Sequence, residues 1–300
     1  MPDPVQILWQ PAGVTLDSLG TSKLVDISDG DTPNIRMSIR MLSIDTPETT
    51  ARSANGAANV DGKFTQLAEW IRQDKAPVSR AFADYILPRL ESGTAGTLQY
   101  DQGEAGKAFF TDTVARRTTR PDGSMRKLFL RAADERFDGY GRLLAYAAPS
   151  YSWKERQEMT RRERATFNLD MIESGHAMPF VIFPSIPGEL DMPMMVAAAQ
   201  TAQDEARGQY TDPLFLPAYE YRACEKLYSI TKKVVEGEDL SYPDRLKWRS
   251  RYCVDMRDRL IYGPEGYMGI PHPYRLFLWP DDVQRAIGML NLTPAPSLVG

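Results

Sequence analysis

Apolar and polar residues alternate along the early part of the chain as they do in half-buried strands. Between residues 23 and 44, the segments LVDIS and IRMSIRMLSI flank SDGDTPN, a cluster of turn-forming residues. Arg36, Ser38 and Arg40 alternate there with apolar neighbours. This period of two predicts strands on both sides of a tight hairpin turn.

The following segment changes from strand to helical periodicity. Residues 49–62 are small and polar, which predicts a loop. Apolar residues then recur at helical spacing in residues 64–71 and 78–89, which predicts two helices. Gly93 and Gly96 are predicted to end this helical region.

The middle of the chain mixes turn, strand and helix signals. Residues 113–120 and 125–132 surround Pro121-Asp122-Gly123-Ser124, which predicts a β-hairpin. The apolar residues after Gly141 predict a further strand. Two helices are expected beyond it, a short one from Asn168 to Gly175 and a longer one over residues 192–208.

After Pro213 the pattern becomes predominantly helical. Apolar residues at helical spacing predict helices over Tyr219–Val235, Pro243–Tyr262 and Pro280–Leu290. We therefore place a domain boundary near residue 212 and expect residues 213–300 to form a helical C-terminal extension.

Composition narrows the class of protein. The 300 residues are 42% hydrophobic and 25% charged, as in a soluble globular protein that buries a core. The net charge of −4 gives no overall basic field, although a local basic cleft can exist on an acidic protein. With two cysteines and two histidines, a structural zinc site is disfavoured, and free buried thiols are expected.

Targeting signals are absent from the given sequence. Residues 1–14 lack a basic region before a continuous apolar run, and no apolar stretch has the length of a membrane-spanning helix. We expect a cytoplasmic protein with no membrane partner.

Three short motifs carry groups that can do chemistry: DGDT at 29–32, IDTPE at 44–48 and DGYGR at 138–142. Each alone has an ordinary structural interpretation as a turn or a helix start. Together they supply carboxylates and arginines at strand ends. Hard oxygen ligands suit Ca²⁺ or Mg²⁺, and the arginine fork binds phosphate through two hydrogen bonds.

The order and spacing of these motifs resemble the staphylococcal nuclease (thermonuclease) family. DGDT, RMLSIDTPE and DGYGRLLAY occur in the family's order, followed by FNLDMIESGHA and AQTAQDEARGQY. The resemblance covers roughly residues 20–212 and is interrupted at about 49–125. It implies an α+β fold with a five-stranded OB-type barrel, packed helices and a large insertion. The implied domain is 1–212, followed by the extension 213–300.

The resemblance also implies residue roles. Asp31, Asp45 and the backbone carbonyl of Thr46 match ligands of one Ca²⁺ ion, with Mg²⁺ or Mn²⁺ as alternatives. Glu48 matches the residue that orients or deprotonates the attacking water, and two arginines match the phosphate clamp, namely Arg40 and Arg142.

Substrate contacts follow the family less closely. Tyr140 matches a tyrosine that contacts the nucleotide phosphate, whereas Gly139 replaces a common lysine. Phe180 or Phe183 takes the place of tyrosines that stack on a base, which any aromatic face can do. His176 is not expected to act in catalysis.

Arginines and lysines gather in two further segments. Their members are Arg116, Arg117, Arg120, Arg126, Lys127 and Arg131, and then Arg161, Arg162 and Arg164. A solvated face and a nucleic-acid track are both compatible with this pattern.

The sequence supports three functional hypotheses. The first is a Ca²⁺-dependent nuclease that hydrolyses phosphodiester bonds of DNA or RNA, preferably single-stranded, because a cleft that stacks bases favours splayed strands. The second is a catalytically inactive OB-type module that binds nucleic acid or a protein partner, the latter through the C-terminal extension. The third is a phosphoesterase for small nucleotides.

Overall fold

Short strands and longer helices make up residues 22–49 and 51–296, the part of the chain that the computed structural model describes. Residues 1–14, whose composition bears on targeting, lie outside it. The chain divides into two units: unit 1 has residues 1–40 and 132–145, and unit 2 has residues 41–131 and 146–300.

The described helices are α1 (Ala54–Arg72), α2 (Arg80–Leu90), α3 (Ala95–Thr118), α4 (Trp153–Glu158), α5 (Phe167–Glu173), α6 (Asp191–Asp204), α7 (Ala218–Val235), α8 (Tyr242–Arg245) and α9 (Val283–Leu290). The strands are β1 (Lys23–Ile27), β2 (Pro33–Arg36), β3 (Ile39–Met41), β4 (Ile44–Asp45), β5 (Leu128–Phe137), β6 (Leu143–Pro149), β7 (Met178–Pro179), β8 (Val181–Ile182), β9 (Tyr252–Asp255), β10 (Leu260–Tyr262), β11 (Arg275–Leu278) and β12 (Thr293–Pro294).

Unit 1 contains the predicted hairpin. Strands β1 and β2 pair antiparallel, with Lys23 opposite Arg36 and Ile27 opposite Pro33. The turn between them closes through a 3.0 Å hydrogen bond from Ser28 N–H to the Thr32 carbonyl. The hairpin strands therefore form as expected, but the half-burial that the alternation predicted is wrong, because all of β1 and all of β2 except Asn34 are exposed. The second predicted strand is also divided, since β2 ends at Arg36 and β3 begins at Ile39.

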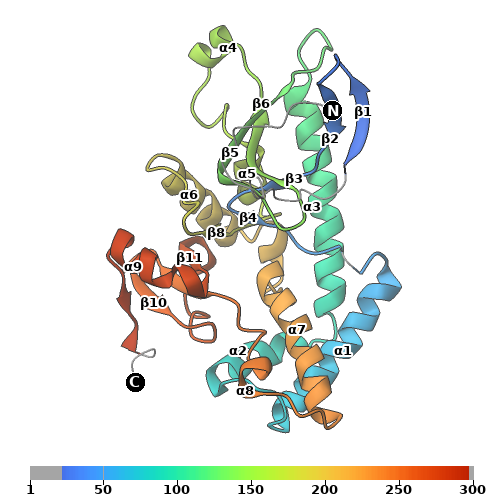
Figure 1. The fold of residues 1–300 in the computed structure, drawn as a ribbon, viewed down its shortest axis with the longest axis vertical. Helices are drawn as coiled ribbons and strands as arrows, with labels where there is room; N and C mark the ends of the chain where they lie inside the picture. Colours follow the sequence, from blue (N-terminus) through green and yellow to red (C-terminus); the bar gives the residue numbers. More distant parts are fainter. Residues whose placement is uncertain (1–21, 50, 297–300) are drawn as a thin grey trace, which may run out of the picture. The chain divides into compact units, whose positions relative to one another are not determined.

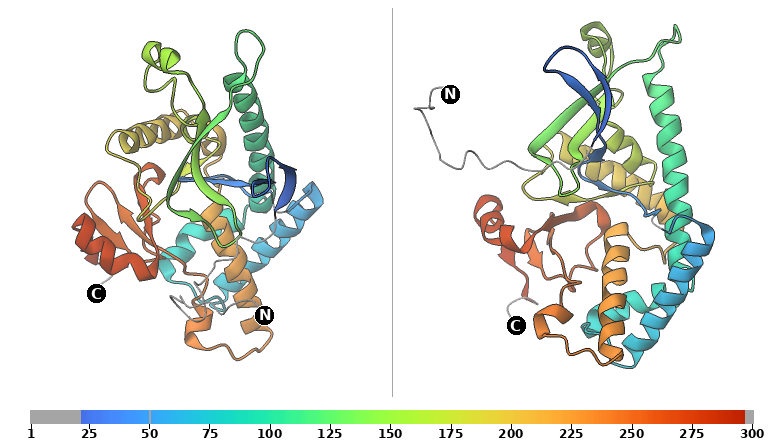
Figure 2. Two further views of the ribbon diagram at one scale, coloured as in Figure 1. Left: turned by 45° about the horizontal axis from the view of Figure 1, so that its top comes forward. Right: turned by 45° about the vertical axis from the view of Figure 1, so that its right-hand side comes forward.

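The helices α1, α2 and α7 share one apolar core in unit 2. Phe64, Leu67 and Ile86 are buried there together with Leu227 of α7. Helix α1 lies against both α3 and α7 (Figures 1 and 2). No helix of the described residues is long and apolar enough to cross a membrane.

A five-stranded sheet forms the other part of unit 2. Its order is β12-β10-β9-β11-β8, and β8 joins it by parallel pairing with β11. Its apolar residues share a core with α5, α6 and α9, in which Val181, Val254 and Leu276 are buried. Residues 213–300 are thus built into the same core as residues 167–199.

The α+β class is confirmed, but the OB-type barrel is not. Four separate sheets form among the described residues, and none of them closes into a barrel. Strands β3, β6 and β5 make a three-stranded sheet in that order, while β4 pairs only with β7 in a two-stranded sheet.

The helix predicted over Pro243–Tyr262 is wrong, and the extension is not wholly helical. Helix α8 ends at Arg245, and strands β9 and β10 follow it. The side chains of Cys253 and Val254 are fully buried between β10 and β11, and such buried positions favour β-branched and other compact apolar residues. Tertiary burial overrides the helical spacing of these apolar residues.

Three predictions for the insertion at 49–125 are also wrong. Helix α1 begins at Ala54 within the predicted loop, Gly96 lies inside α3 instead of ending the helical region, and α3 continues through the first arm of the predicted 113–120 hairpin. Gly93 does follow the end of α2, with φ +68°. Small residues explain the first two errors: a Cβ at Gly96 would lie 2.6 Å from the Ala57 carbonyl oxygen, so these positions serve close helix packing. The turn at Gly123 is confirmed, with φ +82°.

The predicted domain boundary near residue 212 separates a nuclease-like domain from a C-terminal extension, and it stays a prediction. The two units have other limits, and both sides of residue 212 belong to unit 2.

Candidate active site

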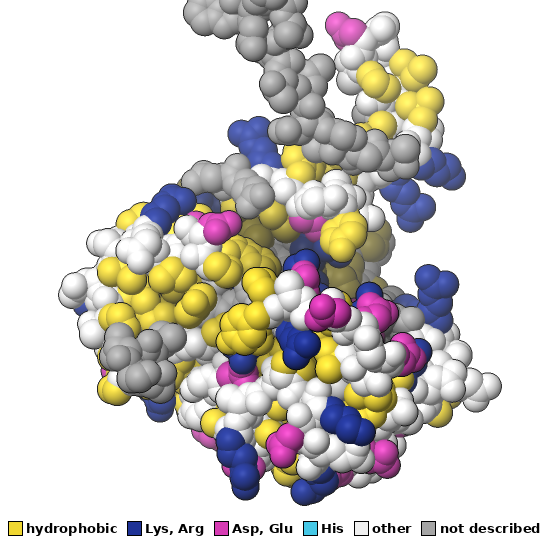
Figure 3. Space-filling model, turned by 60° about the horizontal axis from the view of Figure 1, so that its bottom comes forward, with side chains coloured by type: hydrophobic (Ala, Val, Ile, Leu, Met, Phe, Trp, Pro, Cys, Tyr) yellow, Lys and Arg dark blue, Asp and Glu magenta, His cyan; other side chains and the backbone are white. Residues whose placement is uncertain are grey.

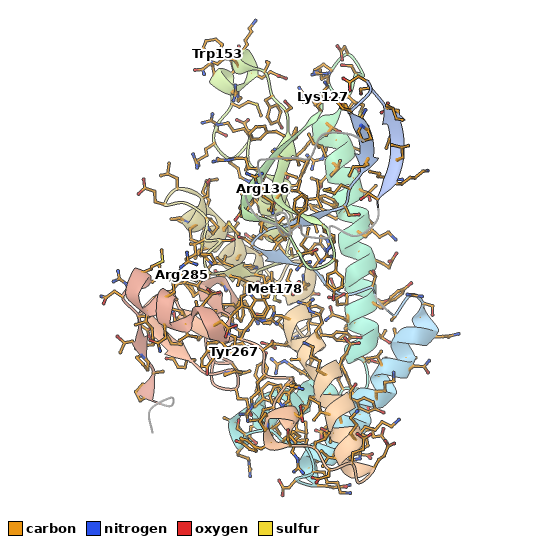
Figure 4. All side chains as sticks on the ribbon, in the orientation of Figure 1. Lys127, Arg136, Trp153, Met178, Tyr267 and Arg285 are labelled. Carbon is orange, nitrogen blue, oxygen red and sulfur yellow. The ribbon has the colours of Figure 1, made fainter. Side chains whose placement is uncertain are left out.

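A carboxylate pair lies at the end of β4 in unit 2. Asp45 stands opposite Met178 of β7, which Figure 4 labels, and Glu48 follows three residues later. Asp45 is only 2% exposed. Because an unpaired buried carboxylate is costly, this residue requires cationic or hydrogen-bonding partners.

Helix α3 fixes the backbone at Glu48. Gln99 is 1% exposed, and its side-chain oxygen accepts a 2.9 Å hydrogen bond from Glu48 N–H. The amide nitrogen of Gln99 donates to the Leu216 carbonyl at 2.8 Å. One buried amide therefore connects the candidate site to the segment just before α7.

A glycine lets α3 approach this segment closely. A Cβ at Gly103 would lie 2.7 Å from Thr49 Cγ2 and 3.2 Å from the Pro47 carbonyl oxygen. Both distances are shorter than ordinary van der Waals contact. Gly103 thus allows the helix backbone to pack directly against residues 47–49.

Arg222 of α7 binds both carboxylates. Its Nη2 donates to Asp45 Oδ2 at 2.7 Å, and its Nη1 lies 3.3 Å from Asp45 Oδ1 and also donates to Glu48 Oε1. Burial opposes the charge on this guanidinium, but Asp45 and Glu48 outweigh that effect and raise the pKa of Arg222. Both carboxylates therefore converge on one cation.

Arg222 could not be predicted from the sequence. The residue lies in AYEYRACEK, which carries no motif, and it is separated from Asp45 by more than half of the chain. Only the packing of α7 against the insertion helices reveals its position.

Further charges surround the pair. Burial and the charge of Glu48 raise the pKa of Glu225 above its ordinary value, while Arg222 and Lys63 act in the opposite direction. Arg251 is close enough for its charge to interact with Asp45 and Arg222, and burial lowers the pKa of its guanidinium. The site contains more carboxylates near Glu48 than the sequence analysis anticipated.

The remaining polar candidates belong to unit 1. Asp31 lies in the exposed β1–β2 turn, where its carboxylate accepts a 3.1 Å hydrogen bond from the Thr32 hydroxyl. Arg40 is half-buried in β3. Arg142 follows a turn at Gly141, pairs with Asp138 at 2.6 Å and lies over the exposed Tyr140 ring. Roles for these four residues stay predictions.

Phe180 and Phe183 are core residues in this structure. Phe180 stacks on Tyr219 with ring centroids 5.2 Å apart, and the Arg251 guanidinium lies 5.0 Å from its ring centroid. Phe183 is 2% exposed. These protein contacts occupy ring surface that a stacked base would need.

The donor set suits a hard cation only in part. Asp45 and Glu48 offer carboxylate oxygens, and the half-buried Thr46 lies between them in sequence, with its backbone carbonyl as a further oxygen. Among the described residues, however, no group of three or more His, Cys, Asp or Glu side chains is placed to hold a metal ion. A divalent ion here would need carbonyl or water ligands beside the two carboxylates.

Comparison with known proteins shows a sequence similarity to a nuclease. Over 138 residues, the chain is 25% identical to Endonuclease YhcR of Bacillus subtilis (strain 168). The chain resembles an endonuclease. The match covers 45% of this chain but 10% of that protein, so the chain spans about a tenth of its relative's length. No protein-family profile matches the chain.

Several of the clustered arginines are neutralised inside unit 2. Arg117 and Arg162 both pair with Asp170, and Arg126 pairs with Glu155. Arg116, Arg117, Arg162 and Arg207 line a pocket of about 490 Å³ together with Asp170 and Glu173. Basic and acidic side chains are also interspersed on the face shown in Figure 3. The ion pairs with Asp170 and Glu155 favour a structural role for Arg117, Arg126 and Arg162.

Proposed function

We propose that this chain is a metal-dependent nuclease that hydrolyses phosphodiester bonds of DNA or RNA. The observation that carries the proposal is that Asp45 and Glu48 both pair with Arg222. These two carboxylates lie in IDTPE, one of three motifs whose order along the chain resembles that of the thermonuclease family. The similarity to an endonuclease supports the same reaction class.

Asp45, the Thr46 carbonyl and Asp31 are the residues that would hold Ca²⁺, with Mg²⁺ or Mn²⁺ as alternatives. When bound, such an ion supplies electrostatic stabilisation to the negative charge that develops on phosphate. Glu48 is the side chain that would orient the attacking water and accept its proton at a carboxylate oxygen. Its backbone is already held by Gln99, which limits the motion of the carboxylate.

Arg40 and Arg142 would bind the phosphate oxygens, because two guanidinium groups balance the charge of the transition state. Tyr140 would contact the nucleotide phosphate from the same turn as Arg142. A single-stranded substrate is proposed, since the bases and phosphates of a splayed strand are accessible to protein side chains.

A second candidate function is a binding module without turnover. The observation that favours it is that Arg222 occupies both carboxylates. In such a module, this ion pair would be structural, and nucleic acid or a protein partner would bind through residues 213–300 or the arginine cluster.

Cleavage assays separate these candidates. Labelled single-stranded DNA and RNA oligonucleotides would be incubated with Ca²⁺, Mg²⁺ or Mn²⁺, and with a chelator. The nuclease proposal predicts cleavage that the chelator abolishes, and weaker turnover of a mononucleotide diester. Tight binding of the oligonucleotides without cleavage under every metal condition would support the module instead.

A further inference from the structure

The cation that joins Asp45 and Glu48 comes from the part of the chain to which the sequence assigned no role. Arg222 uses two guanidinium nitrogens on Asp45, and one of them also donates to Glu48. Its side chain is 30% exposed, whereas that of Asp45 is 1% exposed. The guanidinium thus covers a buried carboxylate from the solvent side.

A divalent ion on Asp45 would compete with this guanidinium for the carboxylate. Metal–oxygen distances are about 2.0–2.6 Å. Since Nη2 of Arg222 already lies 2.7 Å from Asp45 Oδ2, a metal on that carboxylate would stand within a few ångströms of a positive group. At such separations the repulsion between like charges is substantial, even with solvent present.

Further charged groups surround the ion pairs of Arg222. Glu225 lies one turn along α7 from Arg222, and burial with the charge of Glu48 raises its pKa. Arg251 adds a second guanidinium near Asp45. Asp45, Glu48 and Glu225 lie near Arg222, with Lys63 and Arg251 as further cations, so a divalent ion at Asp45 would have to compete with Arg222.

We propose that Arg222 is a further residue of the active site, supplied by α7, which neutralises Asp45 and Glu48 until a divalent ion binds and then contacts a phosphate oxygen of the nucleic acid. With a divalent ion held at Asp45, Arg222 would release that carboxylate at Nη2 and keep the hydrogen bond from Nη1 to Glu48. The released nitrogen is a charged donor beside the residue that holds the water. This inference rests on the proposed nuclease function and extends it to residues 213–300.

The first test measures metal affinity without nucleic acid. Ca²⁺ would be titrated into the full-length chain by calorimetry, with Tb³⁺ luminescence as a second readout. Arg222→Gln removes the competing cation, so we expect its Ca²⁺ affinity to rise on the order of tenfold, the value of one charge-assisted hydrogen bond. Arg222→Lys retains the charge without the fork and should give a smaller rise.

Arg249→Gln is the matched control. Like Arg222, Arg249 lies within residues 213–300 and has a side chain that is 30% exposed. It forms an ion pair with Glu265. Its loss removes an arginine ion pair of similar exposure and should leave the Ca²⁺ affinity unchanged. Circular dichroism would verify that each variant is folded.

The second test measures substrate binding at saturating Ca²⁺. A phosphorothioate single-stranded oligonucleotide, which resists cleavage, would bind Arg222→Gln several-fold more weakly than the wild type, and Arg249→Gln like the wild type. An unchanged or lower Ca²⁺ affinity in Arg222→Gln, or unchanged oligonucleotide binding, would overturn the proposal.

The outcomes also separate this inference from the nuclease proposal. If the wild type cleaves DNA with metal but Arg222→Gln leaves Ca²⁺ affinity unchanged, the inference fails and the function stands. If the wild type never cleaves while Arg222→Gln binds Ca²⁺ more tightly, the function fails and cation exchange stands.

Discussion

At the scale of single residues, the site is a balance of charges rather than a set of isolated side chains. Asp45 is buried and depends on its partners, Glu48 is partly exposed, and Arg222 connects them. Because one guanidinium serves two carboxylates, a change at any of the three residues alters the others. This coupling makes nearby ionisable groups sensitive reporters of the site.

Glu225 gives a pH-dependent prediction. Its pKa is raised in the folded chain above the ordinary 4.5 by burial and by Glu48, so folding favours the protonated carboxyl. The associated stability is fully present below the unfolded pKa and is lost as the pH rises through the folded pKa. We expect Glu225→Gln to be more stable than the wild type at about pH 7, with a difference that disappears toward about pH 4. Urea unfolding across this range measures it; a difference independent of pH would contradict the account.

At the scale of elements, the position of Glu48 depends on how closely α3 approaches. Gly103 has no room for a Cβ beside Thr49 and Pro47, whereas Gly62 in α1 has no atom within 4 Å of that position. The same substitution at these two helical glycines therefore separates close packing from helix propensity.

Gly103→Ala should lower the free energy of unfolding by about 1–3 kcal/mol, because residues 47–49 must shift. Gly62→Ala should raise it by about 0.5–1 kcal/mol through better helix propensity. Thermal or urea unfolding of both variants provides the comparison. Equal effects at the two positions would show that α3 does not pack closely against residues 47–49.

Local patterns predicted some of these elements and missed others for identifiable reasons. The β1–β2 hairpin and helix α6 follow from alternation and helical spacing, which depend on nearby residues. Gly96 of α3 was interpreted as a helix end because its close-packing partner, the Ala57 carbonyl, lies far away in sequence. Strand β9 was missed because its burial comes from β10 and β11.

The candidate site shows the same limit. Asp45 and Glu48 could be named from IDTPE, since a short motif carries both. Arg222 and Gln99 could not, because each reaches the site through tertiary packing. The sequence predicted that Phe180 or Phe183 stacks on a base, but the ring contacts of both residues with protein atoms are visible only in the structure.

At the scale of the whole molecule, a buried ion pair joins distant parts of unit 2. Arg275 of β11 is 1% exposed and donates at 2.8 Å to Glu220 of α7, to the Tyr219 hydroxyl and to the Ile270 carbonyl. Glu220 is 1% exposed and also accepts from the Tyr85 hydroxyl of α2. The C-terminal sheet and the helices around α7 are thereby connected.

Loss of the Glu220 charge should strongly destabilise the protein. Glu220→Gln leaves the Arg275 guanidinium buried without a counter-charge, and we expect a loss of about 3–5 kcal/mol in the free energy of unfolding. Glu236→Gln, which breaks the exposed pair with Lys232, should change it by less than about 1 kcal/mol. Similar small losses in both variants would show that the buried pair does not hold these parts together.

The central claim is that the carboxylate pair at the end of β4 performs metal-dependent cleavage. The most direct measurement is the rate of cleavage of a single-stranded oligonucleotide with Ca²⁺ by the wild type and by Glu48→Gln, with Glu155→Gln as the control. Glu155 is also half-exposed and paired with an arginine, Arg126, outside the proposed site. We predict a chelator-sensitive wild-type rate that falls by about 10²–10⁴-fold in Glu48→Gln and is unchanged in Glu155→Gln. Equal rates in the wild type and Glu48→Gln, or cleavage that persists with chelator, would contradict the claim.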